Sequence, residues 1–136
     1  MKKVLKYAAL TIVSLFFLLG GSGHFTRTEF FVSMVPPYVP MPREVVYLTG
    51  VLELAGAVAI WFPRWRLWAG NGLFALTIAV TPANIYMWAN PELFPDVSKA
   101  LLFWRLPAQL VLLGLIWWST RAHRQQISVA LPKATT

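Results

Sequence analysis

Four long apolar stretches, separated by short polar or proline-rich connections, dominate the hydrophobic pattern of this chain. Each has about the 17–25 residues that a helix needs to cross the hydrocarbon core of a bilayer. None alternates apolar and polar positions as the strands of a membrane barrel do. The pattern predicts an all-α integral membrane protein, a four-helix transmembrane bundle with helices at about 4–22, 44–62, 67–89 and 100–120.

The longest connection covers residues 24–43 and contains prolines at positions 36, 37, 40 and 42. Proline removes a backbone donor and fixes φ, so a spanning helix is not expected there. The aromatic residues Phe30, Phe31 and Tyr38 make the segment too apolar for a free loop. We expect a Pro-rich interfacial segment between helices 1 and 2 that lies over the outer mouth of the bundle. It is either a lid over a site or a plug at the membrane surface.

The composition indicates that lipid is the main solvent of the chain. Of its 136 residues, 57% are hydrophobic and 12% are charged, against about 25% charged residues in soluble domains. A chain this short cannot bury so much apolar surface in its own interior, which excludes a soluble enzyme and a disordered segment. The absence of cysteine excludes thiolate nucleophiles, Cys-ligated zinc and iron–sulfur clusters.

The basic residues account for orientation in the membrane. The positive-inside rule places both termini in the cytoplasm, so a membrane domain at 1–120 is followed by a cytoplasmic basic tail at 121–136. The formal net charge of +7 is then explained without a nucleic-acid partner, and none is expected. Eight basic residues and no acid fall on the cytoplasmic side: Lys2, Lys3, Lys6, Arg64, Arg66, Arg121, Arg124 and Lys133.

The first stretch also fits a second interpretation. Lys2 and Lys3, the apolar run and the small residues at 20–23 are typical of a secretory signal peptide. Its cleavage would leave three spans and change the charge count.

Five polar residues lie within the predicted spans or at their edge. Each charged side chain at the bilayer centre costs at least about 2.5–3.5 kcal/mol on insertion scales. With a rise of about 1.5 Å per residue, Glu53 and Gln109 lie roughly 13 Å below the outer surface, near the midplane. Asn84 and Arg105 lie roughly 8 Å deep, and His24 stands where the first span leaves the membrane. The five therefore form two tiers in the outer half of the bundle.

Helical spacing places some of these residues on common faces. Arg105 and Gln109 are four residues apart and share one stripe of the last span. Pro82 and Pro107, close to them and to Asn84, free backbone carbonyls at membrane depth, which is typical of binding cavities. We predict a ligand-binding polar pocket open to the outside, built from His24, Glu53, Asn84, Arg105 and Gln109.

The same residues also allow a purely structural interpretation. Glu53 and Arg105 can form a buried ion pair that fixes helix register, with Asn84 and Gln109 completing its hydrogen bonds. An interfacial histidine such as His24 needs no ligand. One His and one Glu do not make a closed coordination set, so no metal site is predicted. No catalytic residue is predicted either.

Five short segments touch all four predicted spans in order: HF at 24–25, MVPPYVP at 34–40, TGVLELAGA at 49–57, TPANIYM at 81–87 and RLPAQ at 105–109. Through them the chain resembles the DoxX family of small four-helix bacterial membrane proteins. The resemblance covers nearly the whole chain up to about residue 120. It implies a multi-pass protein of the bacterial inner (plasma) membrane. The family's namesakes are subunits of thiosulfate:quinone oxidoreductase, and a mycobacterial member is linked to a membrane oxidoreductase complex.

The function that this resemblance implies is a non-catalytic membrane subunit or anchor of an oxidoreductase system, without an intrinsic cofactor. A soluble or membrane-bound oxidoreductase partner would supply the redox centre. The predicted pocket would hold a quinone head group, with Gln109, Asn84 and Arg105 as donors and Glu53 as proton acceptor.

Two alternatives remain. The first is a small-molecule binding or transport protein that uses Arg105 as a charge clamp; alternating access would then require a homo-oligomer. The second is a membrane-protein assembly factor with a purely structural polar cluster. A stand-alone enzyme is not expected, because nothing in the sequence provides a nucleophile or an oxyanion site.

Overall fold

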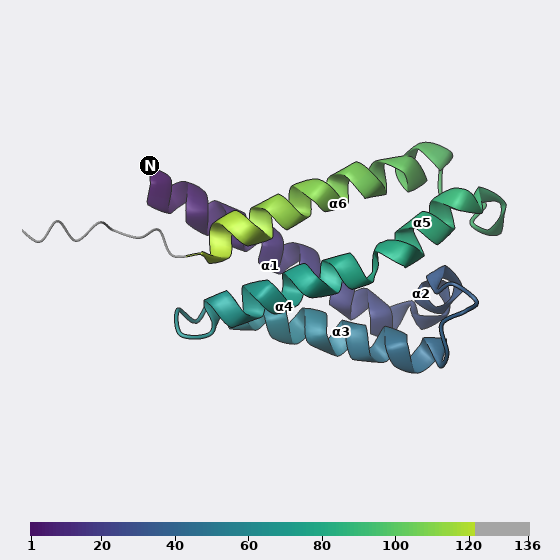
Figure 1. The fold of residues 1–136 in the computed structure, drawn as a ribbon, viewed down its shortest axis with the longest axis horizontal. Coiled ribbons are helices and arrows are strands. Elements are labelled where there is room, and N and C mark those ends of the chain that lie inside the picture. The colour runs from purple at the N-terminus through teal and green to yellow at the C-terminus, as the bar shows by residue number, and fades with distance from the viewer. Residues whose placement is uncertain (122–136) are drawn as a thin grey trace, which may run out of the picture.

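The computed structural model describes residues 1–121, and all regular secondary structure in this range is helical (Figure 1). Apart from Arg121, the predicted basic tail lies outside the described residues. In chain order the elements are α1 (Lys2–Thr26), α2 (Thr28–Met34), α3 (Pro42–Ala59), α4 (Arg66–Ala79), α5 (Thr81–Ala89), the 3₁₀ turn η1 (Pro91–Leu93) and α6 (Lys99–Thr120).

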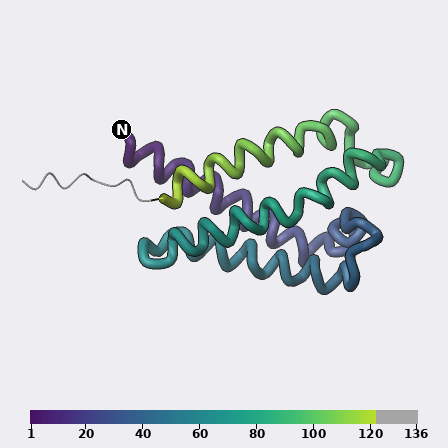
Figure 2. Tube along the Cα trace, in the orientation of Figure 1, coloured from purple at the N-terminus to yellow at the C-terminus, as the bar shows by residue number. Residues whose placement is uncertain are grey.

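The long helices form a bundle in which each packs against two neighbours. Helix α1 lies between α3 and α6, and α4 completes the ring by contacting both α3 and α6. Helix α5 continues the direction of α4 and packs on α6, while α2 contacts α1, α3 and α5. The start of α1, the α3–α4 turn and the end of α6 lie at one end of the bundle; α2 and η1 lie at the other (Figures 1 and 2).

Three helical stretches are long and apolar enough to cross a membrane: Lys2–Thr26, Arg66–Ala89 and Lys99–Thr120. They correspond to the first, third and fourth predicted spans. The second predicted span corresponds to α3, which has 18 residues and carries Arg43, Glu44 and Glu53. Its two glutamates set α3 apart from α1, α4 and α6, which carry no acidic residue.

Two elements differ from the predicted pattern. Helix α1 continues to Thr26, and the segment predicted to be interfacial contains the short helix α2 before its prolines. The third apolar stretch is divided at Val80 into α4 and α5. Pro82 stands in the first turn of α5 and has no N–H to donate to the preceding turn, so a single unbroken helix is not formed.

Two clusters of buried apolar side chains stabilise the bundle. The larger one lies in the half that holds the chain start, and the smaller one lies under α2, α5 and η1. The first contains Leu10, Val13, Phe17, Ala57, Ile60, Leu73, Leu112 and Ile116. The second contains Met34, Met87, Phe94 and Leu102.

Glycines allow the closest helix contacts. A Cβ added at Gly50 would lie 2.8 Å from the Cβ of His24, so α1 and α3 approach closely at this level. A Cβ at Gly70 would lie 2.3 Å from Oγ1 of Thr120, which brings α4 equally close to α6. Small residues at helix interfaces are the usual means of close packing in membranes.

Candidate functional site

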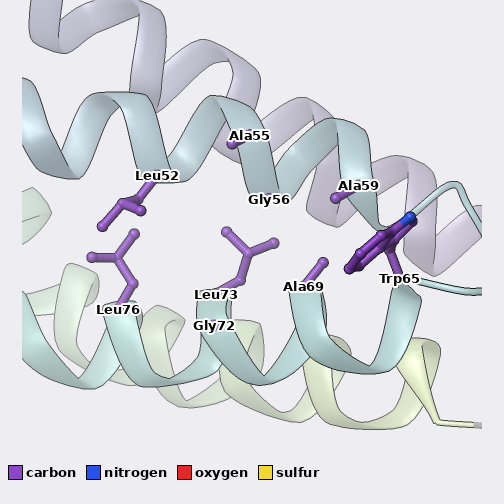
Figure 3. Close-up of a pocket in the computed structure, with 9 residues that line it drawn as sticks. All are labelled: Leu52, Ala55, Gly56, Ala59, Trp65, Ala69, Gly72, Leu73 and Leu76. Atoms are coloured by element: carbon purple, nitrogen blue, oxygen red, sulfur yellow. The ribbon is translucent and has the colours of Figure 1, made fainter.

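Two of the hollows between the helices of residues 1–121 differ in their lining, and one of these two contains the predicted polar residues. The other is a groove of about 300 Å³ between α3 and α4 (Figure 3). In it Leu73 points from α4 toward Gly56 of α3, and Leu52 lies opposite Leu76. No charged side chain lines this groove, so it offers no group for acid–base or ionic chemistry.

The second hollow is a cavity of about 540 Å³, within the range of about 300–1,000 Å³ usual for small-molecule sites. It touches both apolar clusters, through Phe17 and Leu112 on one side and Met34 on the other. Every one of the long helices contributes to its wall. All five residues predicted from the sequence line it: His24, Glu53, Asn84, Arg105 and Gln109.

One wall of the cavity carries a pair formed by His24 of α1 and Glu53 of α3. Nε2 of His24 lies 3.5 Å from Oε1 of Glu53. Nδ1 of the same ring lies 2.7 Å from the carbonyl oxygen of Val46. His24 and Glu53 are 6% and 8% exposed. His24 therefore has protein partners and is buried, because α1 continues past it and the close contact with α3 covers its ring.

The space for the Glu53 carboxylate comes from a glycine on α1. A Cβ added at Gly20 would lie 2.9 Å from Oε2 of Glu53. Gly20 and His24 are four residues apart and so share one face of α1. The carboxylate thus lies against a helix surface that carries only hydrogen at Gly20 and an imidazole one turn later.

The opposite wall carries a chain of hydrogen bonds from α4 to α6. Nε2 of Gln109 donates to the carbonyl oxygen of Thr77 and to Oγ1 of Thr81. Oε1 of Gln109 accepts from Nδ2 of Asn84 at 2.8 Å. Oδ1 of Asn84 accepts from Nε and Nη2 of Arg105 at 3.2 and 3.1 Å. The chain therefore ends on a guanidinium that lines the cavity.

The donor and acceptor roles in this series of hydrogen bonds are fixed at both of its ends. A guanidinium can only donate, so Asn84 must present its oxygen to Arg105 and its NH₂ group to Gln109. A backbone carbonyl can only accept, so Gln109 must present its NH₂ group to Thr77. Both amide side chains are thus oriented unambiguously, and Gln109 uses its oxygen and both its N–H bonds within the protein.

The break between α4 and α5 supplies the acceptor at the start of this chain. Near the end of α4, the carbonyl of Thr77 accepts from the hydroxyl of Thr81 and from the side chain of Gln109. Backbone carbonyls next to a proline break are free to take such partners. The end of α4 and the Gln109 side chain are therefore joined directly, since the Thr77 carbonyl accepts from the amide.

The predicted ion pair between Glu53 and Arg105 is not formed. Across residues 1–121, the ion pairs within 4.0 Å are His24–Glu53 and Arg43–Glu29. Arg105 instead uses the neutral amide of Asn84, and Glu53 uses the imidazole from α1. The two charged residues belong to different walls of one cavity.

The segment after α1 forms the cover of the cavity. Phe31 of α2 lies over the ring of His24, with centroids 4.2 Å apart. The cavity is lined by residues of α2 and of the segment that follows it: Phe31, Met34, Val35, Pro36, Tyr38 and Val39. An ion pair between Arg43 and Glu29 ties α2 to the start of α3. The segment thus lies directly over the polar site, a position that both predicted roles, a lid and a plug, allow.

Sequence reasoning did not identify the threonines and the glycine of the site. Thr49 lies 3.1 Å from Nδ1 of His24, and Thr77 and Thr81 hold Gln109. Thr77 and Thr81 are four residues apart just before Pro82, a spacing that could have indicated a polar helix break. Gly20 has no comparable signal, because its role depends on which helix faces it.

Metal binding has no support in the described part of the chain, residues 1–121, where no group of three or more His, Cys, Asp or Glu side chains could hold an ion. The site has one imidazole and one carboxylate on one wall and one guanidinium on the other. Such a set can bind a polar head group by charge and hydrogen bonds.

Comparison with known proteins identifies a family without an assigned role. Neither the curated proteins nor the solved structures contain a significant match to this chain. Nothing in the comparisons links the chain to the DoxX family, so that resemblance stays a prediction. The family model described as "Domain of unknown function (DUF8561)" matches residues 13–122. This match spans the bundle from α1 to α6 and includes all five polar residues of the cavity. The chain therefore belongs to the family described as Domain of unknown function (DUF8561).

Proposed function

We propose that this chain is a multi-pass protein of the bacterial inner membrane that binds a small amphipathic molecule in the cavity described above. The apolar outer surface of the bundle supports the membrane assignment. Leu19, Leu110 and Trp104 are 75%, 70% and 62% exposed in the middle or outer parts of long helices. Exposed apolar surface on this scale needs a cover, which lipid provides.

Helix α3 serves as the fourth span in this proposal. Its 18 residues correspond to about 27 Å of helix, close to the roughly 30 Å of hydrocarbon. Arg43 and Glu44 fall in its first turn and can reach the surface. Glu53 faces the cavity and is 8% exposed, so its carboxylate does not contact lipid.

The distribution of charge supports cytoplasmic termini. The end of the bundle that holds the chain start and the α3–α4 turn (Figure 1) carries Lys2, Lys3, Lys6, Arg64 and Arg66. The other end has both signs of charge. The positive-inside rule then puts the cavity on the outer side.

The observation that carries the binding proposal is the convergence of five polar side chains from α1, α3, α5 and α6 on one largely apolar cavity. Polar groups at membrane depth are costly, and they are usually retained for a ligand or a transported species. An amphipathic molecule would place its polar head between the two polar walls. Its apolar part would contact Phe16, Phe17 and Leu112.

A more specific version of the proposal is a non-catalytic membrane subunit of an oxidoreductase that holds a quinone. Arg105 would donate to a carbonyl oxygen of the head group, and Glu53 would accept a proton. A partner would supply the electrons, since the chain has no cysteine. The resemblance to the DoxX family supports this version. The incompletely paired guanidinium of Arg105 instead favours a second candidate, a binding or transport protein for an anionic amphiphile.

Native mass spectrometry of the protein purified in mild detergent tests the proposal, with wild type beside Glu53→Gln. We expect a small-molecule adduct on the wild type that is weakened in the variant, while circular dichroism shows equal helix content. A quinone mass would support the oxidoreductase version, and an anionic amphiphile would support the second candidate. Absence of an adduct from both folded proteins would contradict the proposal.

A further inference from the structure

The guanidinium of Arg105 has more donors than the protein uses. It has five N–H bonds and remains positively charged in proteins. Nε and Nη2 donate to one oxygen of Asn84. Among residues 1–121 the structure gives Nη1 no acceptor, and Arg105 lines the cavity. The Nη1–Nη2 edge is therefore available to a bound molecule.

The positive charge of Arg105 also lacks a counter-charge. Asn84 is a neutral amide, and no carboxylate within the described residues lies within 4.0 Å of the guanidinium. The one acid that lines the cavity is Glu53, and its partner is His24. Arg105 is partly buried, and the desolvation of a cation is costly where no counter-charge offsets it.

The hydrogen bonds of His24 indicate that the Glu53 pair does not provide that counter-charge. The carbonyl of Val46 can only accept, so Nδ1, 2.7 Å away, carries a hydrogen. In neutral His24 the lone pair of Nε2 would then face Oε1 of Glu53 at 3.5 Å. Two lone pairs repel at this distance, so the pair is stable when it holds one proton between imidazole and carboxylate. With that proton the pair is neutral overall.

The charges of the cavity therefore sum to one positive charge, that of Arg105. We propose that the cavity takes an amphiphile with a single alkyl chain and a single carboxylate head, which binds the free Nη1–Nη2 edge of Arg105. This inference rests on the proposed function, because it names the ligand class of the same site. Arginine binds carboxylates through two parallel hydrogen bonds. The volume of about 540 Å³ suits one chain and is within the range for small ligands.

Photolabelling in nanodiscs tests the proposal with a matched pair of probes. The first probe is a diazirine-bearing decanoic acid, and the second is the corresponding alcohol with the same chain. The nanodiscs contain phosphatidylcholine alone or a mixture with phosphatidylglycerol. Label attached to the protein is measured by mass spectrometry after digestion. The two probes differ only in the charge of the head, so their ratio measures selection for the carboxylate.

Four variants test which residues cause the preference for the acid probe. Arg105→Gln removes the charge, and Asn84→Asp keeps a hydrogen-bond acceptor for Arg105 while adding a carboxylate from within the protein. Both are expected to lower labelling by the acid about tenfold, which corresponds to about 1.4 kcal/mol, with little effect on the alcohol. Asn84→Asp preserves the test if Arg105→Gln does not fold. Arg64→Gln, in the exposed turn between α3 and α4 at the other end of the bundle, is the matched control, and Ala108→Trp fills the cavity.

The possible results separate this inference from the proposed function. The inference is supported if the acid labels the protein more than the alcohol does, if this preference is lost in Arg105→Gln and Asn84→Asp, and if it is kept in Arg64→Gln. Equal labelling by acid and alcohol, lost only in Ala108→Trp, overturns the anionic ligand and leaves an amphiphile-binding cavity. Suppression of acid labelling by phosphatidylglycerol assigns the site to a phospholipid head and overturns the carboxylate. If neither probe labels the wild type more strongly than it labels Ala108→Trp, the result contradicts both the inference and the proposed function.

Discussion

Replacing Gln109 with leucine is expected to lower the free energy of unfolding by about 2 kcal/mol. The Gln109 amide donates to the Thr77 carbonyl and the Thr81 hydroxyl, both at 2.5 Å, and accepts from Asn84 at 2.8 Å. Hydrogen bonds between membrane helices are worth about 0.6 kcal/mol each on average, so three sum to about 2 kcal/mol. Leucine has a similar size, which limits any packing change.

The assay is reversible unfolding in mixed micelles of mild detergent and sodium dodecyl sulfate, followed by circular dichroism. Thr11→Val is the matched control: its hydroxyl bonds only to the carbonyl of Tyr7 in the same helix and is exposed. We expect this control to change stability by less than about 0.5 kcal/mol. If Gln109→Leu were as stable as Thr11→Val, the hydrogen-bond chain between α4, α5 and α6 would not exist as described.

Three further predictions follow from close packing and topology. Gly70→Ala should lower stability by about 1–3 kcal/mol, because its methyl group would lie 2.3 Å from an α6 hydroxyl; Gly72→Ala, with nothing within 4 Å, should be neutral or stabilising in the same unfolding assay. Gly20→Ala should displace the cavity carboxylate, whose oxygen would be 2.9 Å from the new methyl, and so weaken the native-mass adduct; an unchanged adduct would argue against this geometry. In this cysteine-free chain, a membrane-impermeant maleimide should label Asp96→Cys but not Arg64→Cys in intact cells, and the reverse pattern would invert the proposed topology.

The polar site on α5 and α6 could be predicted from the sequence because its geometry is largely local. Arg105 and Gln109 share a helix face by spacing alone, and depth arithmetic placed Asn84 near Arg105. The hydrogen bonds that join all three are consistent with this reasoning. Helical period and rise determine such placements without knowledge of the full packing.

The partner of Glu53 could not be predicted in the same way. The depth of Glu53 and the face of α3 that carries it do not determine which helix lies opposite. The contact with α1 depends on the packing of Gly50 against His24. The structural alternative therefore paired Glu53 with Arg105, the other charged residue within the predicted spans. The short helix α2 was also missed, because seven residues are too few for a reliable periodic signal.

The most direct test of the central claim, a membrane-embedded cavity that holds a small molecule, is native mass spectrometry on two matched tryptophan variants. Ala108→Trp fills the polar cavity, and Ala55→Trp places the same side chain in the apolar groove between α3 and α4. We predict that the small-molecule adduct of the wild type is kept in Ala55→Trp and lost in Ala108→Trp, with all three proteins folded. An adduct that survives in Ala108→Trp, or is absent from the folded wild type, would contradict the claim.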